Sequence, residues 1–199
     1  MDKVKLGPKT CLYPMPTVLV GALVGGKANY LTVAYCGIVQ HKPPMVAVTL
    51  GRGHYTNVGI REHGTFSVNI PPARLAEVTD WVGLHSGAAV DKSGVFENVY
   101  GVLGTAPMIR ECPLNLECRV VRTLDLGGMN EVFIGEIAEV YADPGILTEG
   151  LPDLAKLDPI VFSMHDNTYW RVGEKLGTAW SLGRAFRGGR RGAGAAPGG

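Results

Sequence analysis

Cysteine is scarce in this chain of 199 residues, which contains four. Cys11, Cys36, Cys112 and Cys118 form no Cys-x-x-Cys pair, and the interval from Cys112 to Cys118 is too long for a zinc knuckle. So few and so scattered thiols argue against a disulfide framework and a cysteine-rich metal site. Reduced thiols are typical of the cytoplasm, and we therefore expect a cytoplasmic protein.

The chain also lacks an excess of charge and a long hydrophobic run. Its formal net charge is +1, which gives no strong field for attracting nucleic acid or a membrane surface. The apolar run 17–26 is too short to span a bilayer. The N-terminus is followed by Pro8, Pro14 and Pro16 where a signal peptide would carry an apolar segment. We expect no nucleic-acid partner and no membrane insertion.

Several catalytic motifs are missing. There is no Walker A sequence, no helical His-Glu-x-x-His and no Ser/His/Asp set with a nucleophile elbow. The five histidines, at positions 41, 54, 63, 85 and 165, have no metal-ligand spacing. These absences argue against a P-loop enzyme, a zinc protease and a serine hydrolase, and no metal site is expected.

Glycine and proline are abundant, with 28 and 13 residues, which favours many turns and a β-rich fold. Hydrophobic periodicity predicts strands over 17–23, 29–35, 45–50, 65–70, 114–124, 131–141, 160–164 and 168–172. It predicts helices over 57–63, capped by Thr56 and stopped by Gly64, and over 73–84. No strand–helix alternation supports a parallel sheet. A mainly β fold is therefore expected, an antiparallel barrel of six or seven strands with a few short helices.

The same patterns give finer expectations. Met45 to Leu50 is nearly all apolar, which indicates a strand buried on both faces. Within 65–70 the apolar residues are expected to face inward, and Thr65, Ser67 and Asn69 outward. Residues 38–42 are expected to be a short link and 144–158 a loop.

The stretch 29–56 carries the prediction of function. Its first strand holds small and polar residues, among them Asn29, Tyr30 and Thr32. Their side chains and the backbone offer donors and acceptors to the pyrimidine edge of an isoalloxazine ring, and they would stabilise negative charge on the reduced ring. The alternative is the polar face of an edge strand. Cys36, just beyond, is either a thiol near the ring or a small buried filler.

A glycine turn follows, with the sequence Gly51-Arg52-Gly53-His54-Tyr55-Thr56. Backbone N–H groups in such a turn, together with the start of a helix, form an anion site. Arg52 can hold phosphate oxygens with two donors, and Thr56 and Asn57 can donate further. Thr56 replaces the third glycine of a dinucleotide fingerprint, so a Rossmann site is rejected. A flat-ring site beside a phosphate site predicts FMN. The alternative is a plain strand-to-helix turn with a surface arginine.

Several short motifs occur in the order and spacing of a known family. Residues 29–35 match N-x-x-T-x-A-aromatic, Pro43-Pro44 precedes an apolar strand, and residues 64–69 match G-x-F-x-V-N. Asp91-Lys92 matches a D-K step, although Ser93 replaces the aromatic residue that usually follows, and residues 169–173 are similar to a closing strand. Over residues 14–186 the chain thus resembles the flavin-reductase-like, FMN-binding split-barrel family.

The resemblance implies an antiparallel Greek-key split barrel and a homodimer, with FMN bound non-covalently near the subunit interface. Carried over by position, the residues that line the ring are Asn29, Tyr30, Thr32, Val33, Ala34, Tyr35 and Cys36. The ring edge and ribityl chain would contact Thr49, Leu50, Gly51 and Arg52. The phosphate would contact Arg52, His54, Thr56 and Asn57. Lys92 and Ser93 would complete the site, from the same chain or across the dimer, and Trp170 would pack nearby.

Electron transfer through bound FMN is the predicted function, with redox proteins as partners, either ferredoxin-like donors or a terminal reductase. One alternative is an NAD(P)H-dependent flavin or ferric reductase. Another is a flavin-binding or redox-sensing module without turnover, in which Cys36 is the switch. Residues 1–186 are expected to form the FMN-binding domain, and the Gly/Arg-rich residues 187–199 a flexible tail.

Overall fold

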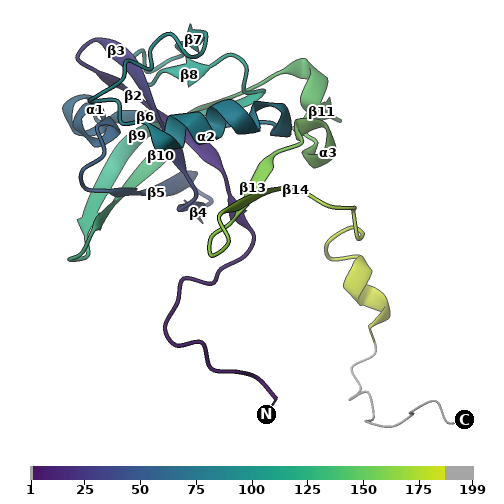
Figure 1. Ribbon diagram of the computed structural model, residues 1–199. Helices are drawn as coiled ribbons and strands as arrows, with labels where there is room; N and C mark the ends of the chain where they lie inside the picture. The colour runs from purple at the N-terminus through teal and green to yellow at the C-terminus, as the bar shows by residue number, and fades with distance from the viewer. Residues whose placement is uncertain (1, 187–199) are drawn as a thin grey trace, which may run out of the picture.

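The protein is built around one curved antiparallel sheet, as the computed structural model shows (Figure 1). The structure describes residues 2–186, and the tail predicted to be flexible, 187–199, lies outside them. The sheet has seven strands in the order β3-β2-β6-β9-β10-β5-β4. Their bounds are β2 Val18–Val24, β3 Lys27–Val33, β4 Cys36–Gln40, β5 Met45–Gly51, β6 Thr65–Ile70, β9 Leu114–Asp125 and β10 Asn130–Ala142.

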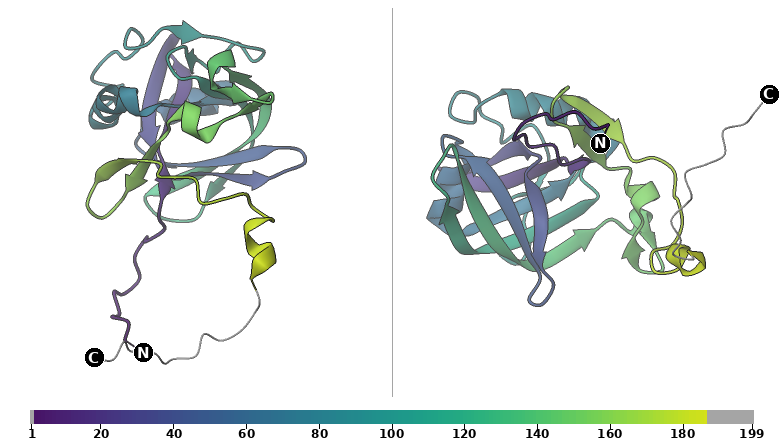
Figure 2. Two further views of the ribbon diagram at one scale, coloured as in Figure 1. Left: turned by 90° about the vertical axis from the view of Figure 1, so that its right-hand side faces the viewer. Right: turned by 90° about the horizontal axis from the view of Figure 1, so that it is seen from below.

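The two ends of this sheet meet because β3 continues into β4 after two residues. The N–H of Thr49 on β5 donates to the carbonyl of Tyr35 in that link, at 2.9 Å. Seen from below, the strands enclose a barrel (Figure 2). The predicted class, a mainly β antiparallel barrel of six or seven strands with a few short helices, is confirmed.

The apolar faces of the strands fill the barrel. Leu31, Val48, Phe66 and Phe133 are buried together there, since each strand turns every second side chain inward. Phe66 lies directly against the backbone of Gly135 on β10, where a Cβ would come within 2.6 Å of the ring. The barrel core therefore accommodates the ring of Phe66 because β10 has no side chain at Gly135.

A second apolar cluster covers the outer face of β2 and β3. The 3-10 turn η1 (Ala73–Leu75) and helix α2 (Ala76–Leu84) lie there, and α2 buries Val82 against β3. Tyr30 points into this cluster, where its ring meets Phe96 edge-on with centroids 5.5 Å apart. The predicted helix 73–84 is confirmed, with a 3-10 first turn.

Thr65, Ser67 and Asn69 point to the outer face of β6, as predicted, but residues 105–109 cross that face and bury all three. The Asn69 side chain makes four hydrogen bonds of 2.8–3.0 Å, to Leu19 O, Ser67 Oγ, Ile109 N and Asn115 Nδ2. Buried polar side chains that are fully hydrogen-bonded follow the same alternation as solvated ones. The sequence period does not distinguish the two cases.

Two expectations, about β5 and about the link that precedes it, are wrong. β5 alternates between buried and half-buried residues instead of being buried on both faces, because Thr49 and Gly51 on its second face border a cavity. The expected link 38–42 overlaps strand β4, which pairs with β5 and forms an edge of the sheet.

Helix α1 (Thr56–His63) joins β5 to β6. Gly64 ends it in the left-handed conformation, with a φ of 64°, as predicted. The predicted cap is wrong: Tyr55 is the N-cap and no side chain caps the helix. Thr56 lies in the first turn instead, and its hydroxyl accepts a hydrogen bond of 2.8 Å from Asn29 Nδ2.

Residues 144–158, expected to be a loop, contain short elements. These are η2 (Pro144–Ile146), β11 (Leu147–Thr148), β12 (Leu151–Pro152) and α3 (Leu154–Leu157). The carboxylate of Asp153 caps α3 by accepting from Ala155 N at 2.9 Å. Elements of two to four residues are too short for hydrophobic periodicity to reveal.

The remaining strands lie beside the barrel. β1 (Met15–Pro16), β13 (Ile160–Ser163) and β14 (Thr168–Arg171) form a three-stranded sheet, and β7 (Asn98–Val99) pairs with β8 (Met108–Ile109). The N-terminal segment and the segment after β14, which ends in η3 (Leu182–Ala185), leave the barrel on the same side (Figures 1 and 2). No helix within residues 2–186 is long and apolar enough to cross a bilayer.

Candidate functional site

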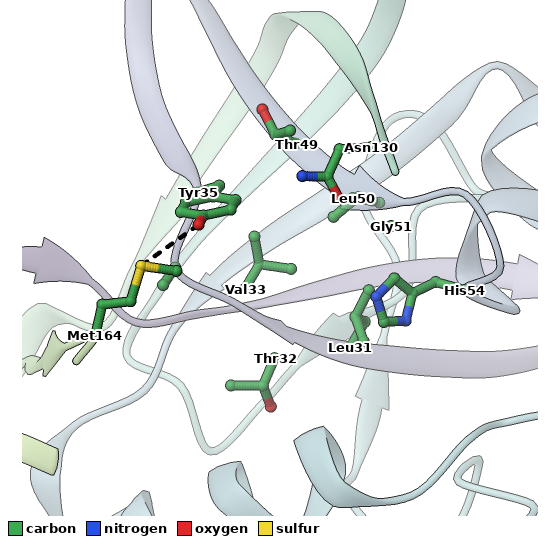
Figure 3. Close-up of a pocket in the computed structure, with 11 residues that line it drawn as sticks. Leu31, Thr32, Val33, Tyr35, Thr49, Leu50, Gly51, His54, Asn130 and Met164 are labelled. Atoms are coloured by element: carbon green, nitrogen blue, oxygen red, sulfur yellow. Dashed lines mark hydrogen bonds between the residues drawn. The ribbon is translucent and has the colours of Figure 1, made fainter. Parts of the chain in front are cut away.

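A cavity of about 200 Å³ lies where β3 and β5 end and β10 begins, with Met164 of the β13–β14 turn in its wall (Figure 3). We call it the β3–β5 cavity. Tyr35 and Met164 lie at one end and His54 at the other. Eight of the residues predicted to bind FMN line it: Thr32, Val33, Ala34, Tyr35, Thr49, Leu50, Gly51 and His54. Residues from two distant parts of the predicted stretch thus meet in one place.

Three residues that line the cavity were not predicted, namely Leu31, Asn130 and Met164. Asn130 reaches it because β10 pairs with β5 so that Asn130 lies opposite Gly51. Met164 follows β13, and its sulfur accepts a hydrogen bond of 3.4 Å from the Tyr35 hydroxyl. No local pattern marks either residue, since both are placed by strand register and by a hairpin far away in sequence.

His54 packs on Gly51 so closely that a Cβ on Gly51 would lie 2.9 Å from the imidazole ring. Glycine is required here by the close approach of a side chain. Partial burial, and then the positive charge of Lys92, lower the pKa of His54. The cavity is thus bordered by an imidazole that is neutral at neutral pH, which can both donate and accept a hydrogen bond.

A buried network supports this end of the cavity. Asn57 Nδ2 donates to Gly51 O at 2.9 Å and to Glu131 Oε1 at 2.7 Å, and Arg61 forms an ion pair with the same carboxylate. Glu131 adjoins Asn130, so the network ties the last residue of β5 to the start of β10. Asn57 Oδ1 is buried and accepts from no described residue. Asn57 therefore positions the cavity wall from behind and does not line the cavity.

Arg52 does not face the cavity. Its Nε donates to Gly128 O at 2.7 Å, and its Nη2 pairs with Asp125 on the β9–β10 hairpin. The hydrogen bond from Arg52 holds the pKa of the Asp125 carboxyl below its usual range. The guanidinium predicted to hold phosphate is engaged by a carboxylate at the protein surface.

Asn29, Lys92 and Tyr55 line a second cavity of about 390 Å³, which we call the Asn29 cavity. Tyr55 follows His54, so the two cavities border the same turn on either side. The Lys92 ammonium is buried, where it donates to Tyr30 O at 3.0 Å and to Val82 O at 2.8 Å. Burial lowers the pKa of this lysine to about 8.

Besides Arg52, Thr56 and Asn57, four predicted residues line neither cavity. The Tyr30 hydroxyl points to the outer cluster and donates to Asn98 Oδ1 at 2.6 Å. Ser93 donates from its hydroxyl to Asp91 within its own turn. Cys36 is half-buried against the barrel core, and burial raises the pKa of its thiol to about 12. Trp170 is exposed and donates to Thr168 Oγ1.

The side chains around the two cavities have the chemical character that binding a flavin mononucleotide requires. Apolar side chains and the Tyr35–Met164 pair line the β3–β5 cavity, and Thr49, His54 and Asn130 add polar groups. The buried, unpartnered Asn57 Oδ1 lies behind the His54 end of the cavity. The Gly51–Thr56 turn, which borders both cavities, leads into the N-terminus of α1, where an anion is stabilised. A ring with a polar edge and an anionic chain suits this arrangement.

Comparison with known families agrees with this geometry. A model described as "flavin reductase like domain" matches residues 10–163. This protein belongs to the flavin reductase like family, and its split-barrel class is confirmed. Membership of this family supports a flavin cofactor, FMN, as predicted.

Within the family, the chain is similar to flavoredoxins. It is 47% identical to flavoredoxin from Methanosarcina acetivorans, with a TM-score of 0.90, over 92% of this chain and 98% of the other. It is 35% identical to flavoredoxin of Desulfovibrio vulgaris (Miyazaki F), with a TM-score of 0.85, over 92% and 100% of the two chains. A more distant relative, an NADPH-flavin oxidoreductase from Streptomyces viridifaciens, is 24% identical over 63% of this chain and 66% of that protein.

Proposed function

We propose that this protein binds FMN in the β3–β5 cavity and carries electrons between redox proteins, as its similarity to flavoredoxins suggests. The observation that carries the proposal is the meeting of two predicted segments, 32–35 and 49–51 with His54, around one cavity lined by apolar and polar groups. When bound, FMN supplies the electron chemistry. The chain supplies the binding, the orientation and the exclusion of water.

The residues divide this work by position. Leu31, Val33 and Leu50 form an apolar floor that keeps water from one side of the cavity. Tyr35 and Met164 close one end, and their hydrogen bond of 3.4 Å fixes the ring of Tyr35. Neutral His54 and the amide of Asn130 offer donors and acceptors at the opposite end. No side chain of this set is needed as an acid or base for electron transfer alone.

We propose that the phosphate lies at the Gly51–Thr56 turn. The N-terminus of α1 favours an anion there. The guanidinium of Arg52 would contact the phosphate after its ion pair with Asp125 breaks. Lys92 provides a buried positive charge near the same turn, since it is close enough to lower the pKa of His54. In this arrangement Thr56, Asn57 and Lys92 contribute to phosphate binding although they do not line the β3–β5 cavity.

A reductase that takes electrons from NAD(P)H is the second candidate. The similarity to an NADPH-flavin oxidoreductase favours it, as does the exposure of His54 at the cavity edge. The third candidate, a redox sensor that uses Cys36, is disfavoured because burial keeps that thiol protonated.

A homodimer in the cytoplasm is the proposed state of the protein. Ile38 and Val39 on the edge strand β4 are 68% and 52% exposed, which is typical of a strand that another chain covers. The four cysteines are unpaired thiols, as expected in a reducing compartment.

The first experiment is a visible absorption spectrum of the purified protein, followed by anaerobic addition of NADH and then NADPH. A carrier should be yellow, should keep its colour with both nucleotides and should be bleached by a reduced ferredoxin. Rapid bleaching by either nucleotide would identify a reductase. A colourless protein that takes up no added FMN would overturn both candidates.

A further inference from the structure

A thiol and an imidazole meet on the surface beside the β3–β5 cavity. Cys11 comes from the N-terminal segment, and His165 comes from the turn between β13 and β14. Both residues are exposed, and Cys11 Sγ lies 3.0 Å from His165 Nε2. The fold brings together residues 154 positions apart, so the pair is a product of tertiary structure.

Contacts on both flanks hold this pair. Thr10 Oγ1 donates to Met164 Sδ at 3.0 Å. The backbone N–H of His165 donates to the Tyr13 hydroxyl at 3.4 Å, and the Tyr13 ring meets the imidazole edge-on with centroids 6.2 Å apart. A nucleophile within hydrogen-bond distance of a base that a third side chain orients is the arrangement that activates a thiol.

The other three cysteines are poorly placed to react. Cys112 and Cys118 are fully buried, and burial raises the pKa of both thiols. Cys36 is half-buried with a pKa of about 12. The thiolate is the reactive form of cysteine, so Cys11, exposed and beside an imidazole, is the thiol that the structure singles out.

We propose that Cys11 and His165 form a thiol–disulfide exchange site for small disulfides. His165 Nε2 takes the proton of the thiol, and Cys11 Sγ attacks one sulfur of the disulfide. A new S–S bond forms as the original S–S bond breaks, and the leaving thiolate takes the proton from the imidazolium and departs as a thiol. Cys11 is oxidised to a mixed disulfide, and the other half of the small disulfide is reduced.

The position of this site connects it with the cavity. His165 directly follows Met164, which forms the cavity wall, and Thr10, which precedes Cys11, contacts Met164. A mixed disulfide on Cys11 would stand beside that wall. The exchange chemistry needs no flavin, so the site stands or falls independently of the function proposed above.

The test is incubation of the purified full-length protein, as isolated, with oxidised glutathione, followed by mass spectrometry of the intact chain and of its peptides. We expect one glutathione per chain, on Cys11, and none on Cys11→Ser. His165→Asn should slow the reaction about tenfold or more, because a free thiol is only a few per cent thiolate at neutral pH. His41→Asn, which alters an exposed histidine in a distant turn, should react at the wild-type rate.

The proposal is overturned if Cys36 reacts with glutathione disulfide as fast as Cys11. It is also overturned if the rate of His165→Asn is within about twofold of the wild-type rate, because a positioned base accelerates a reaction by a larger factor. Circular dichroism confirms that each variant is folded. Should His165→Asn misfold, His165→Gln gives the same comparison. The wild-type peptide map is a separate test, since modification first at any cysteine other than Cys11 would also overturn the proposal.

Discussion

At the scale of single residues, the polar end of the cavity depends on charges that are already paired. Arg52 is held by Asp125, and Glu131 is held by Asn57 and Arg61. The first pair is at the surface, whereas the Glu131 carboxylate is 5% exposed. The first can exchange its partner at little cost, since exposed ion pairs contribute about 0–1 kcal/mol. The partly buried ion pair of Arg61 and Glu131 instead helps to hold the cavity wall in place.

Arg52→Ala is expected to weaken FMN binding by about 1.5–3 kcal/mol, the range for a hydrogen bond to a charged group. Asp125→Asn should have the opposite effect, because it releases the guanidinium for the phosphate. Titration of the apoprotein with FMN, followed by flavin fluorescence, measures both. Unchanged affinity in Arg52→Ala would show that the phosphate binds elsewhere.

Asn130→Ala tests the cavity edge that only the structure reveals. Loss of one amide hydrogen bond to the ring should weaken FMN binding by about 0.5–1.5 kcal/mol. Asn167→Ala, on the nearby β13–β14 turn but outside this cavity, is the matched control. The same titration decides, and equal affinities for the two variants would contradict the placement of the ring.

Lys92 should make stability depend on pH. Burial lowers the pKa of this lysine from 10.5 to about 8 in the folded protein. Between these values the unfolded chain binds more protons than the folded one, so this lysine makes the free energy of unfolding rise with pH across that window. Lys92→Met should flatten the rise, whereas Lys9→Met, at an exposed position, should keep it. Urea unfolding near both ends of the window measures the slopes, and equal slopes in wild type and Lys92→Met would refute the assignment.

At the scale of elements, residues 105–109 are held on β6 by the side chains of Thr65, Ser67 and Asn69. Asn69→Ala leaves Ile109 N without its acceptor and removes one of the two acceptors of Asn115 Nδ2. A buried group left unpaired costs about 1–3 kcal/mol. The free energy of unfolding should fall accordingly in urea. Asn130→Ala, an exposed asparagine, should stay within about 0.5 kcal/mol of wild type. A similar loss in both variants would mean that the Asn69 network contributes no special stability.

The sequence predicts the strands and both main helices because their periodicity reflects the inner faces of one barrel. It fails where a second layer decides burial, as on β6, whose polar face is covered by residues 105–109. β4 is missed because its side chains are half-buried or exposed and follow no alternation. In the site, Thr32, Gly51 and His54 are found from local pattern, and Val33–Tyr35, Thr49 and Leu50 from the family resemblance. Asn130 and Met164 are not, since register and a distant hairpin place them.

At the scale of the whole molecule, the edge strand β4 is where we expect two chains to meet. Ile38→Glu places a charge on that edge, and desolvating an unpaired carboxylate in an interface is costly. The variant should be monomeric where wild type is dimeric, as measured by light scattering after size-exclusion chromatography. Leu84→Glu, similarly exposed on α2, should remain dimeric. A dimeric Ile38→Glu would place the interface on another face.

Both ends of the described chain leave the barrel on one side (Figure 1). A tether attached at either end would therefore hold the molecule in the same orientation. If the protein is attached to an electrode through either terminus, the same face of the barrel would lie against the electrode surface. Voltammetry of the two immobilised forms should then give the same interfacial electron-transfer rate, a symmetry that an enzyme with opposed termini would not offer.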